Sequence, residues 1–478
     1  MSTTKNTQIQ CNSQAVGWKK QSKVADHWVP VDGATDGTVE CTLSPRHCKI
    51  KPGKFGFCGV RGNVDGELHT FNWGKSVSAT QERIETEAVN HHSPNAKILS
   101  LGNIGCMMCC DFCQNWETSQ VQHLNDNSVN KYTPQQIIDI CLSNGINIIS
   151  WTYNDPVVWH EFVKETSILA KQNGIKTLYK SAFYIERKPV EELLEYIDIF
   201  SISLKSMDQK FYRKSGGELI PVLERIRQVY DAGKHLEISQ LIVTGRNDNE
   251  VEIQKTIDWV ISTLDKNVPL HFVAFHPAYK YVDTIRTNPN VLLRARELAL
   301  ASGIQYCYIG NVYENGMSDT NCPSCSHTLI KRYGLSSQVI GISQDGECTS
   351  CGLSADVLYP FSATEVVLNF DETITTSSKD FLWDEEVKAI HIELSGSTQN
   401  SVNILVRHLE TEEIQHFRLD GGLKRIIVSK GDHDSSGVSI SWNQDADLRY
   451  YPVLDRAHFP VVENIDVSLM GVKERKAL

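Results

Sequence analysis

The sequence predicts an α/β protein built around a partial parallel (β/α) barrel. Short apolar strands alternate with helical stretches through residues 96–312, which implies parallel strands with outer helices. Two other patterns follow: paired C-x2-C knuckles in residues 313–360, and period-two alternation from residue 361. We therefore expect a Cys-containing segment (1–95), the barrel (96–312), a zinc-ribbon-like segment (313–360) and a C-terminal antiparallel β-sandwich (361–478).

Composition narrows the class of protein. A length of 478 residues with 41% hydrophobic and 22% charged residues is typical of a soluble protein of two to four domains. The first residues lack an apolar signal-peptide core, and no run of eighteen apolar residues occurs, so we expect a cytoplasmic protein with no membrane partner. The fourteen cysteines are then metal ligands and reduced thiols. A net charge of −11 argues against a nucleic-acid partner.

The barrel elements can be placed in order along the chain. Apolar strands are expected at 96–101, 147–151, 175–179, 197–204, 236–243, 270–275 and 305–309. Thr133 and Pro134 begin the first helix as N-cap and first helical residue, and Gly145 ends it. Further helices fit at 158–173, 220–232, 250–264 and 291–301. Active sites of such folds lie where the strands end.

A cysteine-rich loop follows the first barrel strand directly. Cys106, Cys110 and Cys113 have the spacing C-x3-C-x2-C, which suits three ligands of one [4Fe–4S] cluster. The fourth iron would stay open for S-adenosylmethionine, whose one-electron cleavage gives a 5'-deoxyadenosyl radical. Cys109 also permits a zinc knuckle or a closed four-cysteine cluster, but adjacent Cys109 and Cys110 would strain to face one ion. We interpret Cys109 as a buried thiol.

Two other cysteine groups suggest metal. The paired knuckles contain Cys322, Cys325, Cys348 and Cys351. Four thiolates in this arrangement suit structural zinc, and a rubredoxin-like iron or free thiols are the alternatives. Cys41, Cys48 and Cys58 form a weaker group, with His47 or Cys11 as a possible fourth ligand and ordinary buried thiols as the alternative.

Beyond residue 361 the alternation predicts strands of an antiparallel sandwich. They are expected at 365–370, 389–394, 402–409, 413–419, 424–429, 438–442 and 448–453. The acidity of the chain concentrates here, since residues 360–478 hold 20 Asp/Glu against 12 Lys/Arg, a net charge of −8. Nothing in this region has a catalytic pattern, so packing or partner binding is its expected role.

Over residues 20–355 the chain resembles the radical SAM enzymes of the AmmeMemoRadiSam system, relatives of the pyruvate formate-lyase activating enzyme. The resemblance rests on the Cys41 block, Cys-Gly-Val-Arg at 58–61, Cys-Gln-Asn-Trp at 113–116 and Trp-Thr-Tyr-Asn-Asp-Pro at 151–156. It continues through Phe-Tyr-Arg-Lys-Ser-Gly-Gly at 211–217, Gly-Arg-Asn-Asp at 245–248, His-Phe-Val-Ala-Phe-His-Pro at 271–277 and the paired knuckles.

The resemblance implies a radical SAM partial barrel, a [4Fe–4S] cluster on Cys106, Cys110 and Cys113, and S-adenosylmethionine. It places Phe112 near the adenine and Asp155 or Asn154 at the methionine ammonium; a turn and helix cap is the alternative role for Asn154 and Asp155.

The chain also departs from the family pattern. Ser44 replaces a fourth cysteine, Ala274 an arginine, and Ser181-Ala182-Phe183 a Thr-Asn-Gly stretch. Asp-Leu-Lys becomes Ser203-Leu204-Lys205, so Ser203 and Lys205 are the expected cofactor contacts there. These changes lie at strand ends and predict an altered substrate pocket. His271 and His276 flank one strand end, where a satisfied structural histidine is the commoner role, and Cys141 and Cys307 are expected core residues.

We therefore expect an oxidoreductase of the radical SAM class. An external one-electron donor, flavodoxin or ferredoxin, would reduce the cluster, and the radical would abstract hydrogen from an unidentified substrate. A protein or peptide is one candidate substrate, by analogy with activating enzymes, and a small metabolite is equally open. One alternative is a non-catalytic iron–sulfur and zinc scaffold, for which Ser203 and Ala274 are the best support. A second alternative is a zinc-only scaffold.

Overall fold

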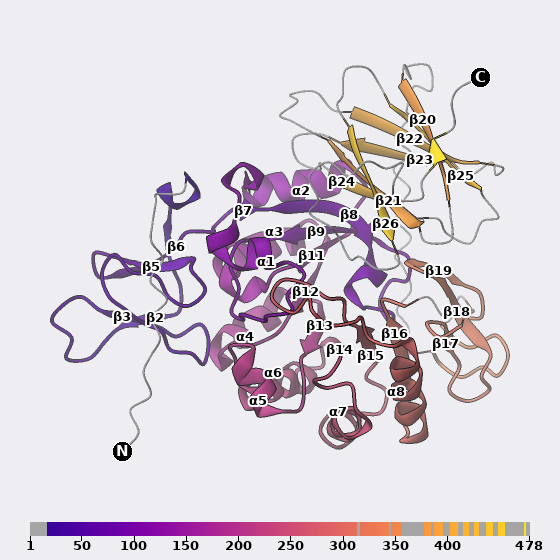
Figure 1. Cartoon of the computed structure of the whole chain (residues 1–478), viewed down its shortest axis with the longest axis horizontal. Helices are drawn as coiled ribbons and strands as arrows, with labels where there is room; N and C mark the ends of the chain where they lie inside the picture. The colour runs from indigo at the N-terminus through magenta and orange to yellow at the C-terminus, as the bar shows by residue number, and fades with distance from the viewer. Residues whose placement is uncertain are drawn as a thin grey trace.

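The computed structural model describes residues 17–312, 316–343 and 346–355, and separate strands of the C-terminal region: 377–383, 387–394, 402–409, 414–419, 425–429, 436–442, 448–454 and 473–474. Within these residues the central element is a curved, mainly parallel sheet with helices outside it (Figure 1). The predicted α/β partial barrel is confirmed.

Seven parallel strands form the barrel wall, and all seven were predicted. In order across the sheet they are β9 (Lys97–Gly102), β11 (Ile148–Thr152), β12 (Lys176–Ser181), β13 (Ile199–Leu204), β14 (His235–Ile242), β15 (Leu270–Ala274) and β16 (Cys307–Gly310). One face of each strand packs on the helices. On β11, for example, Trp151 meets Trp159 and Phe162, while Ser150 and Thr152 face the barrel interior.

The outer helices follow the strands in the expected alternation. They are α2 (Pro134–Ser143), α3 (His160–Gln172), α4 (Arg187–Tyr196), α5 (Gln209–Lys214), α6 (Leu219–Asp231), α7 (Glu250–Thr263) and α8 (Pro289–Ala301). Thr133 caps α2 as predicted, and the cap is reciprocal because Gln136 donates its backbone N–H to the Thr133 hydroxyl and accepts from the Thr133 backbone. Helices α4 and α5 were not predicted.

The first ninety-five residues add small sheets beside the barrel and one strand within it. The strand β7 (Lys75–Ser76) pairs with β10 (Asn130–Lys131). Two three-stranded sheets precede it: one contains β1 (Lys23–Val24), β6 (Glu67–Thr70) and β5 (Arg61–Val64), and the other contains β2 (Trp28–Pro30), β3 (Val39–Cys41) and β4 (Lys49–Ile50). They lie at the left of Figure 1. The strand β8 (Ser78–Arg83) joins the central sheet antiparallel to β9 and leads into the short helix η2 (Ile84–Glu87).

Beyond the barrel lie a small antiparallel sheet and two C-terminal strand groups. The first contains β17 (Thr320–Asn321), β18 (Thr328–Tyr333) and β19 (Ser336–Val339). C-terminal strands β24 (Arg425–Ser429), β21 (Val387–Leu394) and β26 (Leu448–Leu454) extend the central sheet through β8. The second group comprises β23 (Ile414–Leu419), β22 (Val402–His408), β25 (Gly437–Trp442), β20 (Ser377–Leu382) and β27 (Lys473–Glu474). The strand expected at 365–370 lies outside the described residues.

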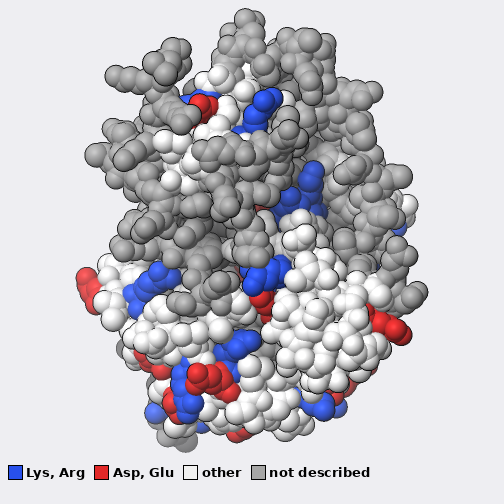
Figure 2. Space-filling model, turned by 90° about the vertical axis from the view of Figure 1, so that its right-hand side faces the viewer, with Lys and Arg blue, Asp and Glu red and all other residues white. Residues whose placement is uncertain are grey.

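The surface of the described residues carries both signs of charge. In the face seen in Figure 2, the blue Lys and Arg side chains of the described residues are separated by red acidic side chains and uncharged surface rather than gathered into one basic stripe. Of the helices that the structure describes, none has the length and apolar character required to cross a membrane.

Candidate active site

The cysteine loop begins where β9 ends and packs against the N-terminal segment. Gly105 adopts φ +83, and a Cβ there would lie 2.8 Å from the carbonyl oxygen of Cys58 and 2.9 Å from a Val60 methyl. Only glycine therefore fits, because both the backbone conformation and the close approach exclude a side chain. This turn places Cys106 directly at the carboxyl end of the barrel strands.

Three thiols of the loop gather beside one carboxylate and one ammonium group. Burial raises the pKa of Cys110 to about 12 and raises the pKa values of Cys106 and Cys113 as well. The charge of Asp155 adds to the effect on Cys106, whereas that of Lys205 opposes the effect on Cys110 and Cys113. In the metal-free chain these cysteines are neutral thiols, so binding a metal must release their protons.

The fourth cysteine of the loop lies elsewhere. The Cys109 N–H donates to the carbonyl oxygen of Ser215 over 2.9 Å, and a Cβ on Gly216 would lie 2.7 Å from the Cys109 sulfur. After burial, the groups that influence the Cys109 pKa are Arg46, Lys280 and Asp111. Cys109 therefore packs on the turn after α5, and neither Asp155 nor Lys205 is among the groups that influence its pKa.

Side chains from neighbouring strand ends hold the loop in place. The Asn154 amide donates to the carbonyl oxygens of Asn103 (2.8 Å) and Gly105 (3.3 Å) and accepts from the Thr118 hydroxyl (2.8 Å). On the other side, the Arg246 guanidinium makes two hydrogen bonds to the Asp111 carboxylate, at 2.7 and 2.8 Å. Asn154 thus ties the loop to β11, and its amide is fully used within the protein.

Asp155 has one satisfied and one unsatisfied carboxylate oxygen. Its Oδ1 accepts from the Ser181 hydroxyl (2.7 Å) and from the Val157 N–H (3.3 Å), so it does cap the short helix η5 (Pro156–Trp159). Its Oδ2 is buried and has no hydrogen-bond partner among the described residues. A buried acceptor without a donor is costly, so this oxygen fits a cationic ligand group placed beside Cys106.

The remaining predicted cofactor contacts line the same strand ends. Lys205 follows β13, and its backbone accepts from Asn247 and donates to Tyr212, while no hydrogen bond of its ammonium group is found within the described residues. Ser203 faces Ser239, with 3.4 Å between the hydroxyl oxygens. Phe112 is buried against Phe211 and Phe275, with ring centroids 5.7 and 6.3 Å away. Ala274 is buried in β15.

The barrel interior carries a buried polar network that sequence reasoning missed. Glu82 accepts from the hydroxyls of Ser100 (2.6 Å) and Tyr153 (2.7 Å), and Glu87 accepts from Thr152 (2.7 Å) and Ser150 (2.9 Å). Burial raises the pKa of both carboxyl groups, and their mutual repulsion adds to the effect on Glu82. The pair therefore retains a proton above the ordinary range of carboxyl groups.

Lys180 lies opposite this pair on β12. Its ammonium donates to the Glu87 carbonyl oxygen and to the hydroxyls of Ser201 and Ser239, each over 3.0 Å. Burial lowers the Lys180 pKa to about 8. The sequence marks only part of the network, because Lys180 and the partner residues Ser150 and Ser201 stand in apolar strands, whereas Glu82 and Glu87 do not.

The two candidate histidines have different positions. His271 lies near the start of β15, at the opposite end of the barrel from the loop, and its Nε2 lies 2.7 Å from Glu237 Oε2. It is a buried structural histidine, the commoner role considered from sequence. His276 lies beyond the end of β15 and is also buried. Cys141 and Cys307 are buried core residues.

Cys41, Cys48 and Cys58 lie near one another in the N-terminal segment. Burial raises the pKa of Cys58 to about 11, and the charges of Cys41 and Cys48 contribute to the shift. Their three sulfurs are not among the donor groups that converge within 4.8 Å in the described residues. Cys11 lies outside those residues, so a metal at this site stays a prediction.

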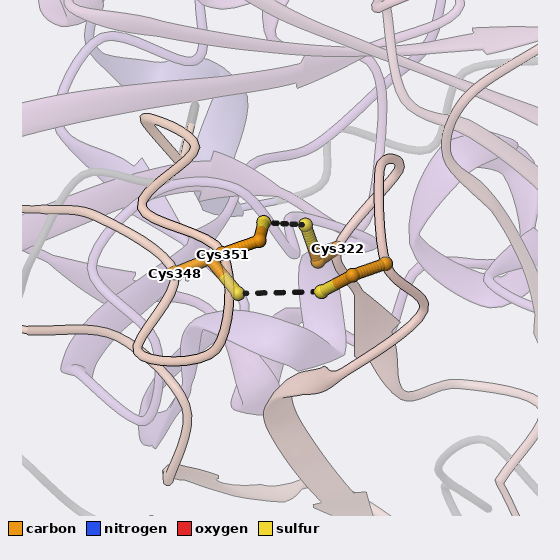
Figure 3. A group of neighbouring side chains, drawn as sticks. Cys322, Cys348 and Cys351 are labelled. Atoms are coloured by element: carbon orange, nitrogen blue, oxygen red, sulfur yellow. Dashed lines mark hydrogen bonds between the residues drawn. The ribbon is translucent and has the colours of Figure 1, made fainter.

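The paired knuckles bring four thiols together (Figure 3). All four sulfurs lie within 4.8 Å of one another, with 3.6 Å between those of Cys322 and Cys351 and 3.7 Å between those of Cys325 and Cys348. Each knuckle closes on a residue with positive φ, Ser326 at 60° and Gly352 at 71°. The N–H of His327 donates to the Cys325 sulfur and lowers the pKa of Cys325 to about 7.

Comparison with known proteins identifies the family to which the chain is similar. The model of the radical SAM superfamily matches residues 103–260, which include the cysteine loop, the elements from β11 to β14 and most of α7. The chain is 35% identical over 325 residues to Uncharacterized protein MJ0808 of Methanocaldococcus jannaschii, a match that covers 68% of this chain and 96% of that protein.

Activating enzymes are similar over shorter stretches. The chain is 23% identical over 111 residues to the (2S)-3-sulfopropanediol dehydratase activating enzyme of Klebsiella oxytoca, covering 23% of this chain and 35% of that enzyme. A solved domain of pyruvate-formate lyase-activating enzyme from Bacteroides vulgatus aligns with a TM-score of 0.30 and 19% identity, over 34% of this chain and 97% of that domain. The narrower resemblance to the AmmeMemoRadiSam system stays a prediction. The chain belongs to the radical SAM superfamily and is a radical SAM enzyme related to the activating enzymes.

Proposed function

We propose that Cys106, Cys110 and Cys113 hold a [4Fe–4S] cluster whose fourth iron binds S-adenosylmethionine. Three protein ligands of one cubane bind three different irons, so their sulfurs surround a volume instead of converging on one point. The loop fits this arrangement, because Cys110 is buried, Cys106 and Cys113 are partly buried, and the Cys109 sulfur packs against Gly216. When bound, the reduced cluster would supply one electron to S-adenosylmethionine, whose C–S bond would break to give methionine and a 5'-deoxyadenosyl radical.

The chain's own residues bind and orient the cofactor in this proposal. The unpartnered Oδ2 of Asp155 accepts from the methionine ammonium, and Ser181 fixes the carboxylate through Oδ1. The ammonium of Lys205 lies close enough to influence Asp155 and two of the cysteines, so it suits the methionine carboxylate. Phe112 offers an aromatic edge for the adenine. Asn154 is a positioning residue, because its amide is used to hold the loop.

The substrate is proposed by class. Activating enzymes are among the chain's relatives, so we propose a protein or peptide substrate that loses a hydrogen atom to the radical. An electron donor such as flavodoxin or ferredoxin would reduce the cluster. If the hydrogen atom is instead taken from a small polar metabolite, the proposed substrate class is wrong.

We also propose that the paired knuckles bind structural zinc. Four thiolates at a Zn–S distance of about 2.3 Å stand roughly 3.8 Å apart in a tetrahedron. The separations of 3.6 and 3.7 Å are close to that value. The ion would crosslink β17 to the loop after β19, beside a small core that contains Leu329 and Ile330.

The observation that carries the proposal is the contrast between Cys106, Cys110 and Cys113, which lie beside Asp155 or Lys205, and Cys109, whose sulfur packs against Gly216. After anaerobic reconstitution, we expect about four irons and four sulfides per chain in wild type and in Cys109→Ala. Cys113→Ala should lose the cluster and form no 5'-deoxyadenosine with dithionite and S-adenosylmethionine. Equal iron loss in the two variants would contradict the ligand assignment, and a retained cluster without 5'-deoxyadenosine would favour a non-catalytic scaffold.

A further inference from the structure

A second group of metal-ligating side chains lies where the N-terminal segment meets the barrel helices. His27 comes from the link between β1 and β2, His160 begins α3, and Glu192 lies in α4. His27 Nε2 lies 3.2 Å from His160 Nε2 and 3.4 Å from Glu192 Oε2, and His160 Nε2 lies 3.3 Å from the same oxygen. Three donor atoms from three separate elements therefore form a nearly equilateral triangle.

The size of this triangle matches one face of a zinc coordination tetrahedron. Zinc binds imidazole nitrogen and carboxylate oxygen at about 2.0–2.2 Å, which places neighbouring ligand atoms roughly 3.3–3.4 Å apart. The measured separations of 3.2, 3.3 and 3.4 Å fall at that spacing. Two histidines and one glutamate are also a ligand set that binds zinc with one position left for water.

Hydrogen bonds alone satisfy the triangle poorly. If both imidazoles carry a proton on Nε2, the two N–H groups point at each other across 3.2 Å. If only one imidazole does, its single N–H group cannot point at both of the other two atoms. In either state one edge of the triangle lacks a linear hydrogen bond. A divalent cation satisfies all three lone pairs together. His160 is fully buried.

The backbone conformation and the surrounding charges are also consistent with a metal site. His27 adopts φ +56, an unfavourable conformation for a non-glycine residue that aims its ring at His160. Lys164 lies 3.3 Å from Glu192 Oε2 but only 2.6 Å from Asp26 Oδ2, so Asp26 can retain the ammonium when a cation binds. The nearby buried Arg61 is likewise neutralised, by Glu161 at 2.7 Å.

We propose that His27, His160 and Glu192 bind one divalent transition-metal ion, with zinc as the occupant, and that this ion fastens the N-terminal segment to α3 and α4. The site is independent of the cysteine loop and of the paired knuckles, since it uses none of their residues. The N-terminal segment also contributes Cys58 and Val60, against which Gly105 packs. The ion would therefore stabilise the surface on which the cysteine loop rests.

The test compares zinc content in full-length variants by elemental analysis after dialysis. His27→Asn keeps a residue that tolerates positive φ but removes the imidazole, and Glu192→Gln removes the charge without changing the shape. The matched control is Glu191→Gln, the preceding and exposed residue of α4. We expect His27→Asn and Glu192→Gln each to contain one zinc per chain fewer than wild type, and the control to match wild type, whatever metal the cysteines hold.

A second measurement separates metal loss from damage to the fold. Added Zn²⁺ should raise the melting temperature of the chelator-treated wild type more than that of His27→Asn, which retains only the stabilisation that zinc gives at the paired knuckles. Equal zinc content in wild type and both variants would overturn the proposal, as would an equal zinc-dependent stabilisation of His27→Asn.

Discussion

At the scale of single residues, the two carboxylate oxygens of Asp155 have different roles. One oxygen holds the chain through Ser181 and Val157, and the other is buried without a donor. Sequence reasoning weighed ligand contact against helix capping as alternatives, but the geometry accommodates both in one side chain. The neighbouring Asn154 differs, because every hydrogen bond that its amide makes here is to the protein.

This difference predicts the effect of Asp155→Asn. The amide oxygen can keep the Ser181 and Val157 contacts, while the amide nitrogen would place a donor against the methionine ammonium. Loss of a charged hydrogen bond of about 1.5–3 kcal/mol should weaken S-adenosylmethionine binding roughly ten- to hundredfold. Calorimetric titration of the reconstituted protein measures the dissociation constant, with Asp258→Asn on the exposed face of α7 as the control. Unchanged affinity in Asp155→Asn would remove Asp155 from the cofactor site.

At the scale of elements, the strands and helices that carry apolar patterns were predicted, and the polar ones were not. All seven parallel strands of the barrel follow the hydrophobic periodicity of the sequence. The sequence of β8, Ser-Ala-Thr-Gln-Glu-Arg, has no such periodicity because its inward residue Glu82 joins a polar network. In α4 the apolar stripe is short, and Pro189 stands within its first turn, which obscured the helix.

The site was predictable to the extent that it is local in sequence. Cys106, Cys110 and Cys113 stand within one loop, and Cys322 to Cys351 form two short knuckles, so spacing alone reveals both groups. The Glu82, Glu87 and Lys180 network and the His27, His160 and Glu192 triangle join residues that are far apart in the chain. No local pattern marks such groups, since only the tertiary packing of β8, α3 and α4 brings them together.

At the scale of the whole molecule, the barrel is continuous with the flanking parts. Strand β24 pairs with the barrel strand β8, and Arg332 of the knuckle segment donates to the carbonyl oxygen of Asn90 at the base of the barrel over 2.7 Å. The guanidinium of Arg332 also bonds to Thr320 (2.6 Å). The knuckle segment therefore contacts Asn90 and strand β16 at one edge of the sheet, whereas the described C-terminal strands continue the sheet beyond β8 at the other edge.

The buried Glu82–Glu87 pair predicts how the stability of the folded protein depends on pH. Burial raises the pKa of both groups, so the folded protein keeps a proton that the unfolded chain releases near the ordinary carboxyl pKa of about 4.3. The unfolded state then binds fewer protons, and stability decreases as the pH rises from that value through the raised pKa.

We expect this decrease to be smaller in Glu82→Gln, which keeps a neutral side chain at all pH values. Thermal unfolding followed by circular dichroism between about pH 5 and pH 8 gives the slope of melting temperature against pH for each protein. Glu224→Gln, an exposed carboxyl group of α6, should follow wild type. The same slope in Glu82→Gln as in wild type would contradict the buried, protonated pair.

The central claim is that one iron of the cluster has no protein ligand and binds S-adenosylmethionine, whose ammonium group lies beside Asp155. Electron paramagnetic resonance of the dithionite-reduced, reconstituted wild type measures this directly, recorded before and after S-adenosylmethionine is added. We predict a [4Fe–4S]⁺ signal whose g values shift on addition, because the amino and carboxylate groups bind the open iron. A four-iron signal that stays identical with S-adenosylmethionine present at saturating concentration would contradict the account.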